Sequence, residues 1–306
     1  MAKAKIYIYK IGEDVSTNGF LGGGISPTTS YAYVTTNTSG LNVRTSNTGI
    51  AYNGASTNNS ISFNKDIFES LIVEVKSVGF GAGPTEVFIT ATTTRFPKNK
   101  TYVYGTILTS SPTSNKFVYN LNKSTQSLYL NIGHIKTTDS YTSFNMNLGN
   151  IYFLTRGDIL TINSYIEDTI NFSVDNLNIV NILKVDILIN NEVVETYTDN
   201  LSDVIYKINK ELCVIGENNI EVRVVYSQGG NIIDTVSEYF TYNHSVPQLQ
   251  NTTPLIDVSN TLKTIVKTNI FEYEKLKSIL LSKSVNIAED DKMLDLILKV
   301  GNLSKV

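Results

Sequence analysis

The sequence predicts a mainly β protein with two β-sandwich domains followed by a helical hairpin. Short segments rich in β-branched and aromatic residues follow one another through about the first 240 residues, several of them with alternating apolar and polar side chains. Gly, Pro and Asn separate these segments and supply the backbone angles that turns need. After residue 257 the apolar residues recur at steps of three and four, which is the helical period.

Residues 1–165 are predicted to form the first domain, a β-sandwich of jelly-roll type. Eight segments in it read as strands: "KIYIYKI", "SYAYVTT", "NSISFN", "SLIVEVKSV", "TEVFITATTT", "TYVYGTIL", "SLYLNIG" and "NIYFLT". The stretch "YNGAS", residues 52–56, is interpreted as a turn between two of them. Many short strands with no helical period between them favour a sandwich.

Residues 166–243 are predicted to form a second β-sandwich. In "ILKVDILINNEVVETYT" every second residue of the first half is apolar, and Asn190-Asn191 suits a two-residue turn. The stretch "NNIEVRVVYSQGGNIIDTVSEYFTYN" alternates in the same way and can reverse at "SQGGN". Two hairpins of this kind give at least four strands.

The stretch "CVIGENNIEVRVVYSQGGNIIDTVSEYF" resembles the carboxy-terminal half of bacterial Ig-like or fibronectin-like domains. The residues that carry the resemblance are Gly216, Asn218 or Asn219, Ile220, Val222 and Val224. The Cys and Trp of antibody domains are absent, which speaks against the antibody type but not against the sandwich. The resemblance implies an Ig-like fold for the second domain.

Residues 244–257 read as a linker and residues 258–306 as two helices. Ser259 is the expected N-cap of the first helix, and Gly301 can end the second. Large apolar side chains on these helices are too numerous for a solvated tail, because full burial of each is worth roughly 1.5 to 3 kcal/mol. The predicted assembly interface consists of Leu276, Ile279, Leu280, Leu294, Ile297 and Leu298.

The C-terminal stretch "LKSILLSKSVNIAEDDKMLDLILKVGNL" is similar to the ends of tail-fibre and baseplate-associated proteins of tailed bacteriophages. The matching residues are Leu276, Ile279, Leu280, Lys283, Val285, Leu294, Leu296, Ile297, Lys299 and Val300. Ser284 stands where such segments often have glycine. The resemblance implies a structural protein of a phage or phage-tail-like particle, with other virion proteins and copies of itself as partners.

Candidate catalytic residues are few, so the sequence predicts neither an enzyme nor a cofactor. His134 and His244 each lack a second ligand at metal-binding spacing, and Cys213 in "ELCVIG" reads as a small buried residue. Acidic residues occur as neighbours, whose side chains do not converge on a strand. A glycosidase, the enzyme alternative, would need two convergent carboxylates.

Charge and hydropathy exclude two further classes of partner. The 25 basic and 28 acidic residues give a net charge of −3, and no basic cluster indicates nucleic-acid binding. No run of about 18 apolar residues predicts membrane insertion, and we do not expect the first residues to act as a secretory signal, because they lack a continuous apolar stretch. We therefore expect a protein made in the host cytoplasm and located in the virion.

Tyrosine is frequent, with 18 residues, whereas tryptophan is absent. Tyr31 with Tyr33, and Tyr102 with Tyr104, are two residues apart, so each pair is expected to share a strand face. Three interpretations stay open: ordinary sheet packing, a subunit contact, or a platform for a bacterial surface glycan. The functional alternatives are accordingly a carbohydrate-binding module and a capsid decoration protein.

Overall fold

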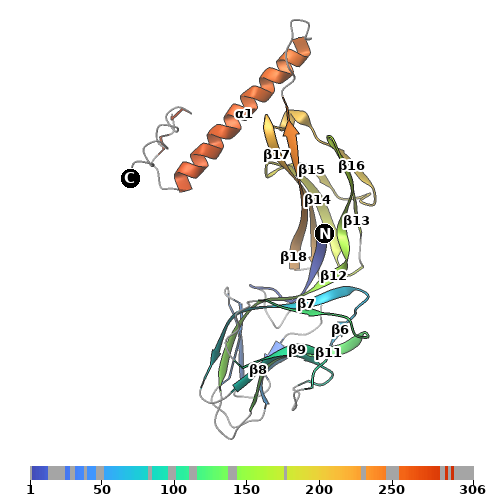
Figure 1. Ribbon diagram of the computed structural model, residues 1–306, viewed down its shortest axis with the longest axis vertical. Helices are drawn as coiled ribbons and strands as arrows, with labels where there is room; N and C mark the ends of the chain where they lie inside the picture. Colours follow the sequence, from blue (N-terminus) through green and yellow to red (C-terminus); the bar gives the residue numbers. More distant parts are fainter. Residues whose placement is uncertain are drawn as a thin grey trace. The chain divides into compact units, whose positions relative to one another are not determined.

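The computed structural model confirms the mainly β prediction, with eighteen strands, one short 3-10 segment and one α-helix among the described residues (Figure 1). The structure describes residues 2–12, 25–27, 32–37, 40–45, 52–81, 85–95, 101–109, 116–136, 143–175, 178–228, 232–245, 255–282, 287–288 and 291–292. None of the helical residues in these ranges forms a span with the length and apolarity needed to cross a membrane.

The chain forms two compact units. Unit 1 consists of Met1–Thr161, Ser173–Lys184 and Val224–Val236, and unit 2 of Ile162–Phe172, Val185–Arg223 and Ser237–Val306. Several long strands therefore contribute residues to both units. The domain boundaries at residues 165 and 243 stay a prediction.

Unit 1 holds most of the short strands. They are β1 (Ala2–Tyr9), β2 (Ile25–Pro27), β3 (Ala32–Asn37), β4 (Gly40–Thr45), β5 (Tyr52–Thr57), β6 (Ile61–Phe63), β7 (Phe68–Phe80), β8 (Thr85–Thr92), β9 (Tyr104–Leu108), β10 (Lys116–Asn120) and β11 (Gln126–Lys136), with the greater part of β12 (Phe144–Ile166). All eight segments predicted as strands overlap one of these elements.

Two sheets organise these strands. The eight-stranded sheet has the order β10-β7-β12-β13-β16, where β13 is Thr169–Val174 and β16 is Val204–Lys207; β1 and β4 also pair with β12, and β3 pairs with β4. The six-stranded sheet has the order β2-β5-β11-β8-β9, with β6 paired to β11. In Figure 1, β7 and β12 form one layer and β9 and β11 another.

Aromatic side chains fill the space between these two sheets. The Phe153 ring of β12 stacks on Phe68 at 4.5 Å and meets the Phe63 ring of β6 edge-on at 5.0 Å. The His134 ring of β11 contacts the Phe144 ring of β12 at 5.5 Å. Alternation along the strands places such side chains inward and polar neighbours outward.

The prediction of a turn at "YNGAS" is wrong, because these residues lie in β5. Gly54 pairs with Gly133 of β11, and a Cβ atom at Gly54 would lie 2.3 Å from the Ile132 carbonyl oxygen. The glycine thus permits a close approach of two backbones within the sheet. Sequence alone does not separate this role from that of a turn glycine.

A four-stranded sheet with the order β15-β14-β17-β18 carries both predicted hairpins. Its strands are β14 (Asn181–Ile189), β15 (Glu192–Tyr197), β17 (Gly216–Gln228) and β18 (Ile232–His244). Asn190 and Asn191 have positive φ angles of 51° and 71°, as a tight two-residue turn requires, so the predicted turn is confirmed.

The single helix of the described residues, α1, spans Leu255–Ser282. It begins three residues before the predicted start, so Ser259 lies inside the helix and is not its N-cap. Pro254 directly precedes α1 in the sequence, and proline is well tolerated at a helix start because no helical hydrogen bond is lost there. Most of the predicted second helix, including Leu294, Ile297 and Leu298, lies outside the described residues.

Candidate functional site

Helix α1 contacts the remainder of unit 2 through polar groups near its middle. The Thr268 Oγ1 atom accepts a hydrogen bond from the Ile215 backbone amide at 2.6 Å. One turn of 3-10 helix, η1 (Lys210–Leu212), provides the second contact, because the Lys267 ammonium donates to the Glu211 carbonyl oxygen. Asn209 caps η1 by accepting from the Glu211 amide at 3.0 Å. The helix is thus anchored by backbone groups next to β17.

Apolar side chains on α1 remain exposed beside these contacts. Val266 is 57% exposed and Ile270 is 58% exposed, although full burial of either would be strongly favourable. Two sets of residues on α1 repeat at every seventh position. One set is Val266, Tyr273 and Leu280, and the other, four positions before each of these, is Leu262, Asn269 and Leu276. This is the heptad spacing of helices that associate side by side.

The predicted interface residues of α1 differ in exposure. Leu280 is 1% exposed, so the chain itself already covers it, whereas Leu276 is half-buried. The Ile279 side chain lies outside the described residues, as do Leu294, Ile297 and Leu298. Near the middle of the helix, Val266 and Ile270 form a more exposed apolar surface than Leu276 and Leu280 of the predicted set. Their i, i+4 spacing is the sequence signal that could have identified them.

A second candidate surface lies on the outer face of the eight-stranded sheet. We call it the Tyr33 face, and it consists of Tyr33 and Thr35 on β3, Asn42 and Arg44 on β4, and Asn145 and Asn147 on β12. Strand register aligns these residues in two rows, Tyr33–Arg44–Asn145 and Thr35–Asn42–Asn147. Gly79 and Ser77 of β7 continue the two rows. Their neighbours along each strand, such as Val43 and Met146, are buried in the core.

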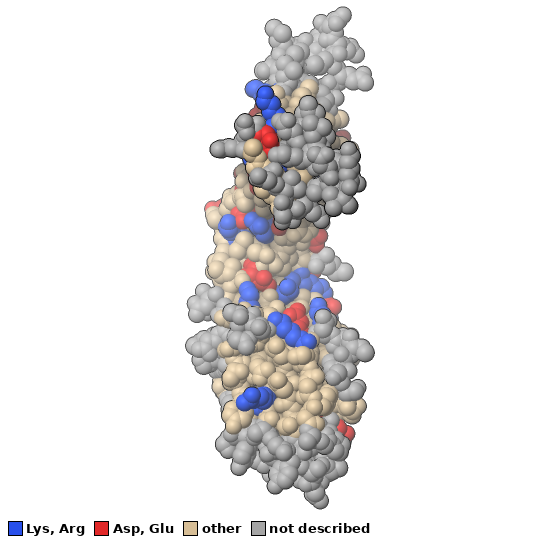
Figure 2. All heavy atoms as spheres, turned by 90° about the vertical axis from the view of Figure 1, so that its left-hand side faces the viewer, with Lys and Arg blue, Asp and Glu red and all other residues tan. Residues whose placement is uncertain are grey.

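Interactions within the Tyr33 face hold its side chains in defined positions. The Arg44 guanidinium lies 5.3 Å from the centre of the Tyr33 ring, within the range of a cation–π contact. Asn42 Nδ2 donates a hydrogen bond to Asn145 Oδ1 at 2.8 Å. On the face drawn in Figure 2, Lys and Arg side chains lie in small groups with Asp and Glu side chains near several of them, and the rest of the coloured surface is uncharged.

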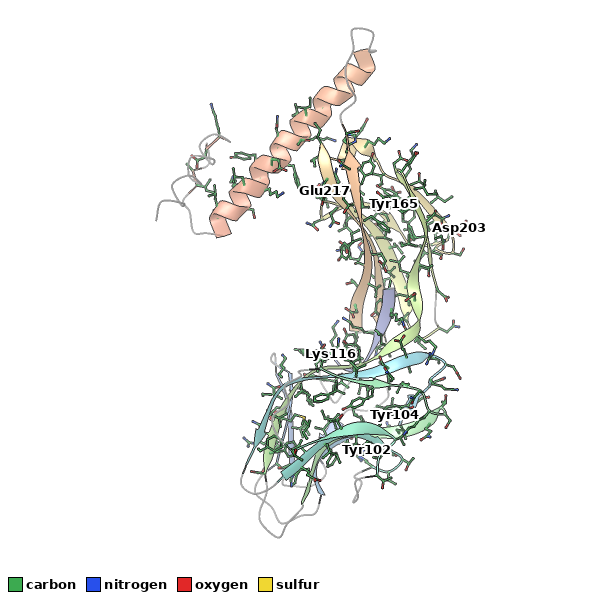
Figure 3. The ribbon with its side chains drawn as sticks, in the orientation of Figure 1. Tyr102, Tyr104, Lys116, Tyr165, Asp203 and Glu217 are labelled. Carbon is green, nitrogen blue, oxygen red and sulfur yellow. The ribbon has the colours of Figure 1, made fainter. Side chains whose placement is uncertain are left out.

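The two predicted tyrosine pairs are not equivalent. Tyr33 is 45% exposed, and Tyr31 lies outside the described residues. Tyr102 is 39% exposed and precedes β9, whereas Tyr104 is 7% exposed and stacks on Phe63 at 5.8 Å (Figure 3). Tyr104 therefore serves the core packing that was one of the three interpretations.

Burial shifts the ionisable groups that the sequence singled out toward their neutral forms. His134 is buried, and removal from water lowers the pKa of its imidazole to about 4. Burial, followed by the Lys210 charge, also lowers the pKa of His244. Burial raises the pKa of the Cys213 thiol to about 11, so the thiolate, the reactive form, is disfavoured at neutral pH.

Metal-binding groups do not converge in the part of the chain that the structure describes. No three of its His, Cys, Asp and Glu side chains are placed to hold one metal ion.

Comparison with known proteins adds little to this description. No protein-family model and no curated protein matches the sequence. Among solved structures, the chain is similar to the glycoside hydrolase domain of Spr0440, Endo-D from Streptococcus pneumoniae R6, with a TM-score of 0.26 and 9% sequence identity. The match covers 73% of this chain and 38% of that one. A score this low supports no conclusion about fold or activity.

Proposed function

We propose that this chain is a non-enzymatic structural protein of a phage tail, tail fibre or baseplate, or of a related phage-tail-like particle. It acts through protein–protein contacts in the virion. The observation that carries the proposal is the exposed apolar surface of α1 at Val266 and Ile270, which a protein partner would cover favourably. The resemblance of the C-terminal sequence to tail-fibre and baseplate-associated proteins supplies the kind of particle.

The β elements in this proposal are two sandwiches, of jelly-roll type in the first domain and Ig-like in the second. The chain order supports the second assignment, since the chain passes from β12 and β13 to β14 and β15 of the four-stranded sheet, returns to β16, and passes again to β17 and β18. Side chains also meet across the two groups: Tyr165 lies 4.9 Å from Phe240, and Phe172 lies 6.2 Å from Tyr197, measured between ring centres. Domains of this kind can act as rigid spacers between other parts of a particle.

A helical hairpin at the C-terminus is part of the same proposal. The Tyr273 hydroxyl donates a hydrogen bond to the Asp291 carbonyl oxygen at 2.7 Å, which brings a residue beyond the end of α1 back to the side of the helix. The chain has thus reversed direction by Asp291. Its apolar residues after this point would extend along α1.

We assign a second copy of this chain as the partner of the exposed surface. The heptad spacing supports a helix-to-helix contact between copies along the exposed part of the seam, from Val266 to Ile270, since the chain itself already covers Leu280 further along. Asn269 at a core position of this part would favour a single register. In a parallel pair of helices, Glu272 of one copy would also face Lys277 of the other. These two residues carry opposite charges and lie at the positions that flank the apolar seam. Ile265 and Ile270 flank the same seam and widen its apolar area.

Association in solution tests this partner directly. Light scattering on the eluted full-length chain should give a multiple of its 33.9 kDa mass. A Val266→Asp and Ile270→Asp double variant should elute at monomer mass, because two buried carboxylates would oppose the contact. Ser278→Asp, which adds an exposed charge away from the heptad seam, is the matched control and should associate normally. A wild-type chain that is monomeric at micromolar concentration would contradict the assignment.

Particle composition tests the proposed location. Protein identification on gradient-purified particles should find the chain in stoichiometric amount, and its absence would exclude the virion role. A truncation after residue 245 should retain its β structure by circular dichroism but fail to join particles. Incubation with purified cell wall should release no product; turnover that a single carboxylate substitution abolishes would establish an enzyme instead.

A further inference from the structure

We propose that the Tyr33 face binds a short oligosaccharide, with acidic sugars bound more tightly than neutral ones. This site is independent of the assembly role of α1, because its residues lie in unit 1 and α1 lies in unit 2. Its basis is the alignment of one exposed aromatic ring, one guanidinium and three side-chain amides on three adjacent strands.

The dimensions of the face fit an extended, hydroxyl-rich ligand. Neighbouring strands lie about 4.8 Å apart and residues two apart on one strand lie about 6.7 Å apart. Three strands, with Gly79 and Ser77 of the fourth, therefore give a strip roughly 14 Å long and 7 Å wide. The strip lies on hydrogen-bonded strands, so little ordering is needed on binding.

The chemistry of the two rows matches the two kinds of surface on a sugar ring. A pyranose has a C–H face, which packs on an aromatic ring, and a rim of hydroxyl groups that both donate and accept hydrogen bonds. Tyr33 offers the ring, while Asn42 and Asn145 offer both donors and acceptors. The Asn42–Asn145 hydrogen bond of 2.8 Å fixes the two amides relative to each other. Such preorganised pairs can engage neighbouring hydroxyls together.

Charge favours an acidic sugar over a neutral one. Arg44 is the only ionisable side chain besides Tyr33 among the six residues of the face, and it is exposed next to the ring. A guanidinium pairs with a carboxylate or phosphate through two parallel hydrogen bonds. One cation is too little for a nucleic-acid backbone, whose binding requires several phosphate contacts.

Composition favours a glycan over a protein partner. The large aliphatic residues of β4 and β12, such as Leu41 and Met146, point into the core and are fully buried. The face itself therefore has a single large apolar group, whereas the centre of a protein interface is usually rich in apolar and aromatic side chains.

Gly79 provides a way to block the face without disturbing the fold. A Cβ atom there would lie 3.8 Å from the Asn145 carbonyl oxygen and 4.0 Å from the Asn145 Cβ atom, so a side chain fits without a clash. Because Gly79 pairs with Asn145, that side chain would stand at the end of the row Tyr33–Arg44–Asn145. Gly79→Leu should therefore obstruct the ligand while leaving the core unchanged.

Binding of the full-length chain to an array of bacterial-type oligosaccharides, neutral and bearing carboxylate or phosphate, tests the proposal. Titration calorimetry with the best of these oligosaccharides should show affinity losses of about tenfold or more for Tyr33→Ala, Arg44→Ala and Gly79→Leu, with melting temperatures unchanged. Tyr239→Ala removes a tyrosine that is 61% exposed on β18 and is the matched control; it should bind as the wild type.

Four results would overturn the inference. They are absence of glycan binding by the wild type at millimolar concentration, full binding by the three face variants, loss of binding only in Tyr239→Ala, and a change in oligomeric mass rather than in glycan affinity. Particle assembly tests the role of α1 separately, because the Tyr33→Ala variant should lose glycan binding and still join particles.

Discussion

The side-chain amide of Gln228 hydrogen-bonds both polar groups of the Tyr7 backbone. Its Oε1 atom accepts from the Tyr7 amide at 2.7 Å, and its Nε2 atom donates to the Tyr7 carbonyl oxygen at 2.8 Å. The contact joins β1 to β17 across 221 residues of sequence, within unit 1. One glutamine thus takes the place that a neighbouring strand would have beside Tyr7.

Replacing Gln228 by Ala should destabilise unit 1. Gln228 is buried, and its loss leaves a buried amide and a buried carbonyl of Tyr7 without these bonds. Each such group costs roughly 1 to 3 kcal/mol, so we expect a loss of about 2 to 4 kcal/mol in the free energy of unfolding by urea denaturation. Gln126→Ala, at a half-buried glutamine on β11, should cost far less. Equal effects of the two substitutions would show that the Tyr7 contact does not matter.

Alkaline pH should weaken the same region through Tyr7 and Tyr226. Both hydroxyls hydrogen-bond Asp234 Oδ2, at 2.7 and 3.3 Å. Burial, followed by the Asp234 carboxylate, raises the pKa of each phenol well above its usual range. The unfolded chain loses the phenol protons at a pKa of about 10, whereas the folded chain keeps them to higher pH. The folded state is therefore fully stabilised below about pH 10 and loses stability as the pH rises above that value.

Each of the two tyrosines should therefore cost about 1.4 kcal/mol of stability at pH 11 relative to neutral pH. The Tyr7→Phe and Tyr226→Phe double variant, although less stable at pH 8, should lose correspondingly less between pH 8 and pH 11 in urea titrations. Tyr239→Phe removes an exposed hydroxyl from β18 and should keep the wild-type pH dependence. An unchanged slope in the double variant would refute the assignment.

Asn218 should be the most sensitive polar position of unit 2. Its Oδ1 atom accepts from the Val214 amide at 2.8 Å and from Asn190 Nδ2 at 2.9 Å, while its Nδ2 atom donates to the Val214 and Gly216 carbonyl oxygens at 2.8 and 3.0 Å. Asn218→Ala should cost about 2 to 4 kcal/mol in unfolding free energy. The neighbouring, exposed Asn219→Ala is the control and should be nearly neutral. A similar cost at both positions would contradict this role.

The sequence anticipated local features more reliably than partners. The strands and the Asn190-Asn191 turn follow from alternation and from asparagine at positive φ, both of which are local. The sequence pattern does not choose between Asn218 and Asn219, because both asparagines fit it. Burial identifies Asn218 as the residue of the hydrogen-bond network. Gly216 has a φ angle of 93°, which explains the glycine.

Long-range pairing lay beyond the sequence pattern. "NIYFLT" predicted a short strand, whereas β12 has 23 residues and pairs with β1, β4 and β7 in different parts of its length. No local signal in the sequence shows which strands will lie alongside it. The Tyr33 face was found only in part for the same reason: Tyr33 was singled out, but its neighbours Arg44 and Asn145 come from other strands.

Mild acid should destabilise unit 1 through His134. A folded-state pKa of about 4, against 6.5 for the free side chain, gives stability that is present above pH 6.5 and is lost as pH falls toward 4. The expected loss between pH 7 and pH 5 is about 2 kcal/mol. His134→Leu should remove this loss, as measured by urea midpoints at both pH values, whereas His244→Leu should retain the part that is due to His134. An equally acid-sensitive His134→Leu chain would place the effect elsewhere.

Helix α1 should loosen when its contact with Ile215 is removed, without unfolding the β structure. Thr268→Val keeps the shape of the side chain but deletes the oxygen that accepts from the Ile215 amide, whereas Thr268→Ser keeps that oxygen. Loss of one such bond is worth about 1 kcal/mol, so amide exchange in residues 255–282 should become roughly fivefold faster in the Val variant. Mass spectrometry of exchanged peptides measures this, with the strands of unit 1 as an internal reference and Thr268→Ser as the control. If the Val variant protects α1 as well as the wild type does, the Lys267–Glu211 contact and apolar packing hold the helix, and Thr268 is dispensable. If protection falls in α1 and in β17 together, the helix belongs to the cooperative core of unit 2, and it could not rearrange for assembly without unfolding that core.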